Sequence, residues 1–179
     1  MEYIRNAYRN VLCKANLNPK TILLSLNLLA RLLELKDIDM GDETNIWAAA
    51  YIASHKPNNF KYSKDVDSFC SENNLEKNKL EKYLQNYIDE LNLIVFPDNC
   101  NNLFYIDRED VLFHIIRSAS RYALNEAVLK QVLGLANLKI EELADELTEY
   151  FTEKVKVLPS DFSKSCAILI KTFFKEATG

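Results

Sequence analysis

Hydrophobic residues recur at helical spacing along most of this chain, so the pattern predicts a series of helices. The clearest is residues 75–93, whose apolar positions share one face while Lys79, Lys82 and Glu90 fall on the opposite face. The apolar positions are Leu80, Tyr83, Leu84, Tyr87, Ile88 and Leu91. We expect this helix to pack on a core with its charged face in water.

Residues 45–55 predict a different kind of helix, because residues 46–53 carry no charge. The three consecutive alanines, residues 48–50, are strong helix formers. A helix that is apolar on every side has no face to offer water, so it belongs in the middle of a bundle. We expect the fold to be built around this helix, with Trp47 and Tyr51 filling the space beside its small side chains.

Helix start and stop signals place the remaining elements. Asn18 followed by Pro19 is an N-cap with proline at the first helical position, and Thr44 can cap the central helix. Pro57 ends the central helix, and Asn74 can turn the chain through a left-handed residue. The other helices are expected at residues 3–15, 19–36, 108–122, 125–135, 140–155 and 160–177, with a short one opening at Ser63.

The most linker-like stretch of the chain is residues 96–102, where proline, aspartate and asparagine cluster. We therefore expect two helical domains, residues 1–96 and 108–179, joined by a linker at residues 97–107. A chain of 179 residues is long enough to bury two small cores.

Composition narrows the class of protein. The chain has only three glycines, whereas hairpins and Gly-rich phosphate-binding loops need positions with positive φ. A β-sandwich, a Rossmann domain or a P-loop enzyme is therefore not expected, and an all-α fold is. The net charge of -4 argues against a protein whose whole surface binds nucleic acid by neutralising phosphates.

The spacing of the cysteines and the length of the apolar runs indicate the cellular compartment of the protein. The four cysteines are far apart and form no Cys-x-x-Cys pair, so we expect reduced thiols and no zinc site. The chain opens Met1-Glu2-Tyr3 without a secretory signal, and no apolar run approaches the roughly 20 residues of a membrane span. We expect an intracellular protein, cytoplasmic or nuclear, that does not contact a membrane.

Three motifs in residues 3–96 occur in a recognisable order. Leu17-Asn18-Pro19-Lys20 precedes a long apolar helix, residues 48–54 are alanine-rich and end Tyr-Ile-Ala-Ser, and residues 62–91 contain a helix, a turn and a second helix. This order resembles a cyclin box, and within that superfamily a core repeat of transcription factor IIB and its archaeal counterpart. The resemblance implies a five-helix bundle with the alanine-rich helix in the centre and a helix–turn–helix at its end.

The chain departs from that family in two ways. No zinc ribbon precedes the first helix, and no second alanine-rich helix follows residue 96. The sequence of residues 122–133 is weakly similar to residues 15–18 and the helix that follows them. We therefore expect the second half to be a degenerate helical bundle, either an eroded cyclin repeat or an unrelated one.

We expect no catalytic, cofactor-binding or metal-binding site. A serine or cysteine nucleophile needs a histidine base and an orienting acid, and the only histidines are His55 and His114. His114 lies between Phe113 and Ile115 on an expected helix, which favours packing or surface placement. The alternative, an unrecognised enzyme or ligand-binding protein, predicts a polar cavity that holds one of these histidines beside carboxylates.

The expected helix–turn–helix carries the lysines that could contact DNA. Cations near the first turn of its second helix could face phosphates, but an ordinary amphipathic helix would leave them solvated among Glu72, Glu76 and Glu81. The candidate residues are Lys61, Lys64, Lys77, Lys79 and Lys82.

A second candidate surface is acidic and lies on the helix expected at residues 140–155. It is either a solvated face or a docking surface for a basic partner. Its residues are Glu141, Glu142, Asp145, Glu146 and Glu149.

The resemblance, together with the lack of a catalytic set, predicts a non-enzymatic adaptor that binds a protein of the transcription machinery and acts in transcription initiation or its regulation. This prediction leaves open whether the protein also contacts DNA. The alternatives are a cyclin-type regulatory subunit of a kinase, a ligand-binding helical protein, and an oligomeric structural protein in which helix 19–36 meets a copy of itself.

Overall fold

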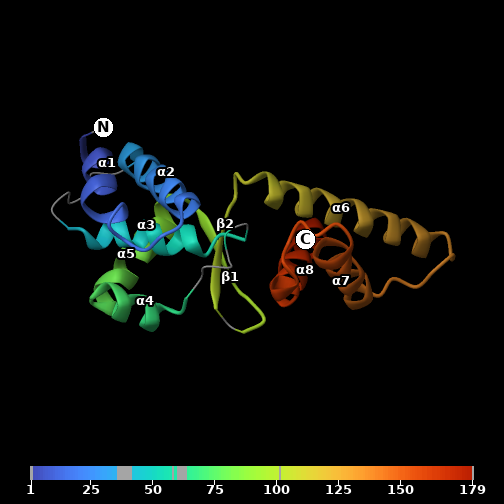
Figure 1. Cartoon of the computed structure of the whole chain (residues 1–179). Coiled ribbons are helices and arrows are strands. Elements are labelled where there is room, and N and C mark those ends of the chain that lie inside the picture. The colour runs from blue at the N-terminus through green and yellow to red at the C-terminus, as the bar shows by residue number, and fades with distance from the viewer. Residues whose placement is uncertain (1, 36–41, 58, 60–63, 101, 179) are drawn as a thin grey trace. The chain divides into compact units, whose positions relative to one another are not determined.

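The computed structural model describes residues 2–35, 42–57, 59, 64–100 and 102–178 and is mainly helical (Figure 1). Over these residues the chain forms eight α-helices and one two-stranded sheet. The mainly helical class predicted from the sequence is confirmed. The chain divides into two compact units: unit 1 is Met1–Val95 with Leu103–Asp107, and unit 2 is Phe96–Asn102 with Arg108–Gly179.

Unit 1 is organised around helix α3 (Thr44–Ser54), which packs against both α2 (Pro19–Leu35) and α5 (Lys77–Glu90). The unit opens with α1 (Glu2–Ala7), which passes into a π-helical turn, η1 (Tyr8–Leu12), so the single α-helix expected at residues 3–15 is wrong after Ala7. A shorter helix, α4 (Val66–Asn73), precedes α5. The predicted place of α3 at the centre of the core is confirmed.

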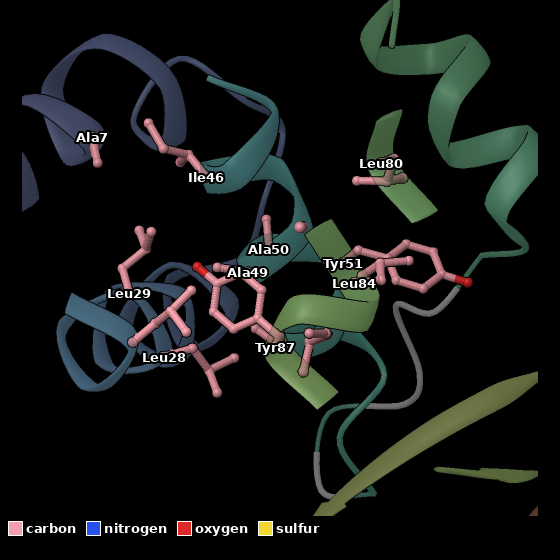
Figure 2. Close-up of a cluster of buried hydrophobic side chains, with 14 of the residues drawn as sticks. Ala7, Leu28, Leu29, Ile46, Ala49, Ala50, Tyr51, Leu80, Leu84 and Tyr87 are labelled. Atoms are coloured by element: carbon pink, nitrogen blue, oxygen red, sulfur yellow. The ribbon is translucent and has the colours of Figure 1, made fainter. Parts of the chain in front are cut away.

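The core of unit 1 depends on the small side chains of α3. Ala49 and Ala50 have no exposed surface. Figure 2 shows Leu29 of α2 and Tyr87 of α5 in the same buried cluster as these alanines, and the Tyr87 hydroxyl donates a 3.4 Å hydrogen bond to the backbone carbonyl of Asn45. Small residues allow neighbouring helices to approach closely. The apolar stripe predicted for α5 is confirmed, because Leu80, Leu84, Tyr87 and Leu91 are buried.

Two of the predicted backbone signals are confirmed. The backbone N–H of Thr21 donates to Asn18 Oδ1 at 2.9 Å, so Asn18 caps α2. Asn74 has a φ of 53° and ends α4 in the left-handed region.

The start of α3 differs from the prediction. Thr44 is the first helical residue, and its own backbone N–H donates to Asp42 Oδ1 at 3.0 Å. The capping carboxylate therefore comes from two residues earlier in the chain. The cap expected at Ser63 lies outside the described residues, and Asp65 caps α4 by accepting a 2.9 Å hydrogen bond from the N–H of Ser68.

The expected linker, residues 97–107, is not a free linker: it runs from the last residue of one strand of a β-hairpin to the end of the other. Strands β1 (Leu93–Pro97) and β2 (Leu103–Asp107) pair, and their short connection requires them to be antiparallel. The loop turns without glycine because Asp98 Oδ1 accepts hydrogen bonds from the N–H groups of Cys100 at 2.8 Å and Asn102 at 2.7 Å. An aspartate side chain can replace the conformational freedom of glycine in this way.

Unit 2 contains three α-helices in its described part. They are α6 (Val111–Val132), α7 (Ile140–Glu149) and α8 (Ser163–Thr178), and α8 packs against the other two. A π-helical turn, η3 (Tyr150–Lys154), extends α7, and a 3-10 turn, η4 (Ser160–Phe162), precedes α8. The break expected at residues 122–125 is wrong: α6 is continuous, because no glycine or proline interrupts it and Leu124 is buried in the core.

None of the described helices combines the length and the apolar character that crossing a membrane requires.

Candidate functional site

A groove of about 840 Å³ opens on unit 1. It lies between η1 with the turn that follows, the start of α2, helix α3 and helix α4. Trp47 contributes aromatic surface to it and packs against the buried Phe69, with ring centroids 6.1 Å apart at an interplanar angle of 74°. Trp47 is half-buried, whereas its neighbours on α3 are buried, so the groove is where the central helix reaches the surface.

Asparagine side chains line the groove beside these rings. Asn18 and Asn73 are engaged within the fold: Asn18 caps α2, and Asn73 Nδ2 donates to the Phe69 carbonyl at 2.9 Å. Asn10 and Asn16 are exposed, and no described residue forms a hydrogen bond with either side chain. Each of these two amides carries a donor and an acceptor that no described residue uses.

The charges along the groove balance. Lys14 and Lys64 line it together with Glu43 and Glu72, and Lys64 Nζ lies 2.7 Å from Glu72 Oε1. A surface that attracts a phosphate backbone needs an excess of cations. The described residues that line this groove have no such excess.

His55 holds the segment that leads into α4 against the central helix. Its side chain is fully buried and stacks on Tyr51, with ring centroids 4.0 Å apart. Nδ1 lies 2.8 Å from the carbonyl oxygen of Tyr51, and Nε2 lies 2.7 Å from that of Lys64. These contacts to backbone carbonyl groups position the Lys64 side of the groove. His114, by contrast, is exposed on α6.

The buried thiols are poor nucleophiles. Burial raises the pKa of the Cys70 thiol and raises that of Cys166 to about 12. Since the thiolate is the reactive form, both side chains act as small apolar groups near neutral pH. Over the described ranges, no three His, Cys, Asp or Glu side chains gather closely enough to hold a metal ion.

The predicted DNA-contacting lysines are largely paired with carboxylates. Lys64 pairs with Glu72, Lys77 Nζ lies 2.8 Å from Asp67, and Lys79 Nζ lies 2.9 Å from Asp42. The hydrogen bond to Asp67 also raises the pKa of Lys77. Lys82 is exposed on α5, and Lys61 lies outside the described residues.

The predicted acidic surface lies on α7, where all five of its residues are exposed. Lysines of the same chain pair with three of them: Lys171 with Glu141, Lys139 with Glu142 at 2.6 Å, and Lys154 with Glu149 at 3.1 Å. Asp145 and Glu146 lie between these pairs. The surface is therefore more nearly neutral than the sequence of α7 alone indicates.

The groove was not predicted from the sequence. Its residues come from three separate parts of the chain, around Asn10, Trp47 and Phe69. The one signal available is the position of Trp47, a large aromatic residue among alanines in a stretch expected to be buried on every side. Nothing in the periodicity distinguishes Asn10 or Asn16 from other exposed asparagines.

Comparison with known proteins adds no family to these observations. No protein-family model matches the chain, and a search of curated proteins finds no match. The geometry of unit 1 and the motif order of residues 3–96 are therefore the grounds for a functional proposal.

Proposed function

We propose that this protein is a non-enzymatic adaptor that binds an extended segment of a partner protein in the groove of unit 1. The observation that carries the proposal is that the aromatic ring of Trp47, packed on the buried Phe69, lines the groove together with Asn10 and Asn16, whose amides form no hydrogen bond with a described residue. Aromatic residues in a groove supply much of the affinity of protein interfaces. Amide side chains can meet the N–H and C=O groups of an extended backbone.

Charge favours a protein over DNA as the partner. Lys64, Lys77 and Lys79 already lie within salt-bridge distance of carboxylates. Each of these three cations is offset by a nearby carboxylate, so together they give no local excess of positive charge for a phosphate backbone.

A cyclin-like identity for unit 1 is part of the proposal. Five helices in the order α1 to α5, with α3 packed in the middle, agree with the arrangement that the motif resemblance implies. On this basis the partner belongs to the transcription machinery, and a protein kinase that this chain would activate is the alternative. Unit 2 is a three-helix bundle over its described residues and is proposed as an accessory to this binding function.

The only tryptophan of the chain is Trp47, so its fluorescence reports directly on the groove. Peptides selected from a displayed library on the intact protein should shift the Trp47 emission as they bind. The double variant Asn10→Ala/Asn16→Ala should raise their Kd by at least tenfold, because two amide contacts are lost. Asn27→Ala, at an exposed asparagine of α2 that does not line the groove, is the matched control and should leave Kd unchanged.

Selected peptides that bind without changing Trp47 emission, and equally well to the double variant, would show that the groove is not the binding site. Affinity capture from cells with the wild type and with the double variant then identifies the class of partner protein. Partners lost only with the double variant should be transcription proteins or, on the alternative, a kinase.

A further inference from the structure

Helix α6 carries apolar side chains that unit 2 does not cover. The buried residues of α6 end at Leu124, and none of residues 125–132 is buried. Tyr122 is 72% exposed, Leu129 57% and Val132 77%. Figure 1 shows this end of α6 continuing into the long loop before α7. Helices owe most of their stability to packing of an apolar face, and an exposed apolar patch of this kind marks an interaction surface.

The exposed residues follow the seven-residue repeat of a coiled coil. Ile115, Tyr122 and Leu129 are seven residues apart and occupy the a positions of the repeat. The d positions are also all exposed, and they are Val111, Ser118, Asn125 and Val132. The repeat runs the whole length of α6 on the side away from its buried residues.

We propose that this stripe pairs α6 with α6 of a second copy of the chain as a parallel, two-stranded coiled coil. In a parallel pair each a or d residue meets its own copy, so the apolar layers of Ile115, Leu129 and Val132 match themselves. The layer of Asn125 then places amide against amide. The polar d layers of Ser118 and Asn125 meet their own copies only when the two helices are in register.

Charge at the edges of the stripe is complementary only in the parallel arrangement. There a g residue faces the e residue five positions later on the partner helix, which places Arg121 beside Glu126. In the same way Val128 faces Leu133, so the apolar surface continues at the C-terminal end. Glu126 also pairs with Lys130 of its own helix at 2.7 Å, so its carboxylate would be shared between two cations.

The exposed apolar residues of α6 supply the surface that a pair would bury. Seven large apolar residues of α6 and its C-terminal turn are at least 40% exposed: Val111, Ile115, Tyr122, Val128, Leu129, Val132 and Leu133. A second α6 would cover the parts of these side chains at and beside the a and d positions, which removes apolar surface from water on both copies. The proposal concerns unit 2 alone and does not depend on the groove of unit 1.

Sedimentation of the full chain over a range of concentrations tests the pairing. The wild type should be a dimer at tens of micromolar, and Leu129→Glu/Val132→Glu should raise the dimer Kd at least 100-fold while circular dichroism shows that the helices remain. The matched control is Leu23→Glu, because Leu23 is an apolar residue of α2 that is 69% exposed; it should dimerise like the wild type.

A charge-reversal series tests the parallel register. Arg121→Glu and Glu126→Arg should each weaken the dimer about tenfold, and the combined reversal should restore it, because the pair re-forms with opposite sign. A monomeric wild type at the highest concentration, a dimer that survives Leu129→Glu/Val132→Glu, or dissociation by Leu23→Glu would overturn the proposal. Failure of the combined reversal to restore the dimer would overturn the parallel arrangement.

Discussion

Asp42 shows how much one side chain contributes to the position of the central helix. Its Oδ1 accepts from the N–H of Thr44 at 3.0 Å, and its Oδ2 lies 2.7 Å from the Tyr83 hydroxyl and 2.9 Å from Lys79 Nζ. The carboxylate therefore caps the start of α3 and connects it to α5. Burial by itself raises the pKa of this carboxyl, but the hydrogen bonds from Lys79, Thr44 and Tyr83 outweigh burial and hold the pKa well below its usual range.

This depressed pKa predicts a pH dependence of stability. The carboxylate stabilises the fold above its unfolded pKa of about 4, and that contribution is lost as the pH falls toward the lower folded pKa. Asp42→Asn should therefore cost about 1–3 kcal/mol at pH 7, and the difference from wild type should shrink below about pH 4. Urea unfolding at a series of pH values measures both quantities.

The control for this prediction is Asp145→Asn, at an exposed aspartate of α7, which should change the free energy of unfolding by less than about 0.5 kcal/mol at pH 7. A difference between Asp42→Asn and wild type that stays constant from pH 7 to pH 2 would contradict the assignment of Asp42.

At the scale of the element, helix α3 is stable where it is because both its faces are covered. An isolated helix of this length is marginal in water, so packing and not propensity keeps it folded. Its small residues determine how closely α2 and α5 approach, as the contacts of Ala49 and Ala50 in Figure 2 illustrate. A substitution on α3 therefore acts on three helices at once.

Ala49→Asp tests this dependence. The new carboxylate would be buried without a cation, which should cost about 3–5 kcal/mol of unfolding free energy and could unfold unit 1 entirely. Urea or thermal unfolding followed through Trp47 fluorescence measures the loss. Ala177→Asp places the same change at an exposed alanine of α8 and should cost less than about 1 kcal/mol. Equal melting of the Ala49→Asp variant and the wild type would show that α3 is not central.

At the scale of the whole molecule, the boundary between the two units passes through the hairpin. The loop and Phe96 belong to unit 2, whereas most of both strands belongs to unit 1. Asn99 at the tip joins unit 2 through its N–H, which donates to the Asp161 carbonyl at 2.9 Å, and through Oδ1, which accepts from the N–H of Lys164 at 2.9 Å. It thereby caps the first turn of α8.

Fragments of the chain test the role of this tip. Residues 96–179 contain all of unit 2, whereas residues 108–179 lack the tip and its cap on α8. We expect the shorter fragment to be less stable by about 1–3 kcal/mol, since a lost cap alone costs about 0.5–2 kcal/mol. Urea unfolding of both fragments measures the difference. Asn99→Ala in the longer fragment should reproduce part of the loss, and equal stability of the two fragments would mean that the tip contributes nothing.

Sequence reasoning was accurate for features that depend on nearby residues. The cap at Asn18, the left-handed Asn74 and the stripe of α5 each depend on residues within a few turns of one another. It was wrong where one local sequence pattern is typical of two different structures. The polar run after Phe96 is typical of a linker but also of a hairpin loop, and the strands on either side are too short to produce a clear alternation.

The functional surfaces were harder to predict because they join distant residues. Lysines counted as free cations from the sequence pair with acids elsewhere in the chain, as Lys79 does with Asp42. Asn10, Trp47 and Phe69 line one groove although they are far apart in the sequence. Only a folded chain brings such residues together.

The sequence by itself determined that the chain is helical and that residues 46–53 form the buried centre of its first half, because periodicity and side-chain size are local properties. Only the tertiary structure decided where α3 reaches the surface at Trp47, which lysines are neutralised, and that α6 extends uncovered beyond Leu124. These features depend on which distant segments cover one another, and neither composition nor periodicity contains that information.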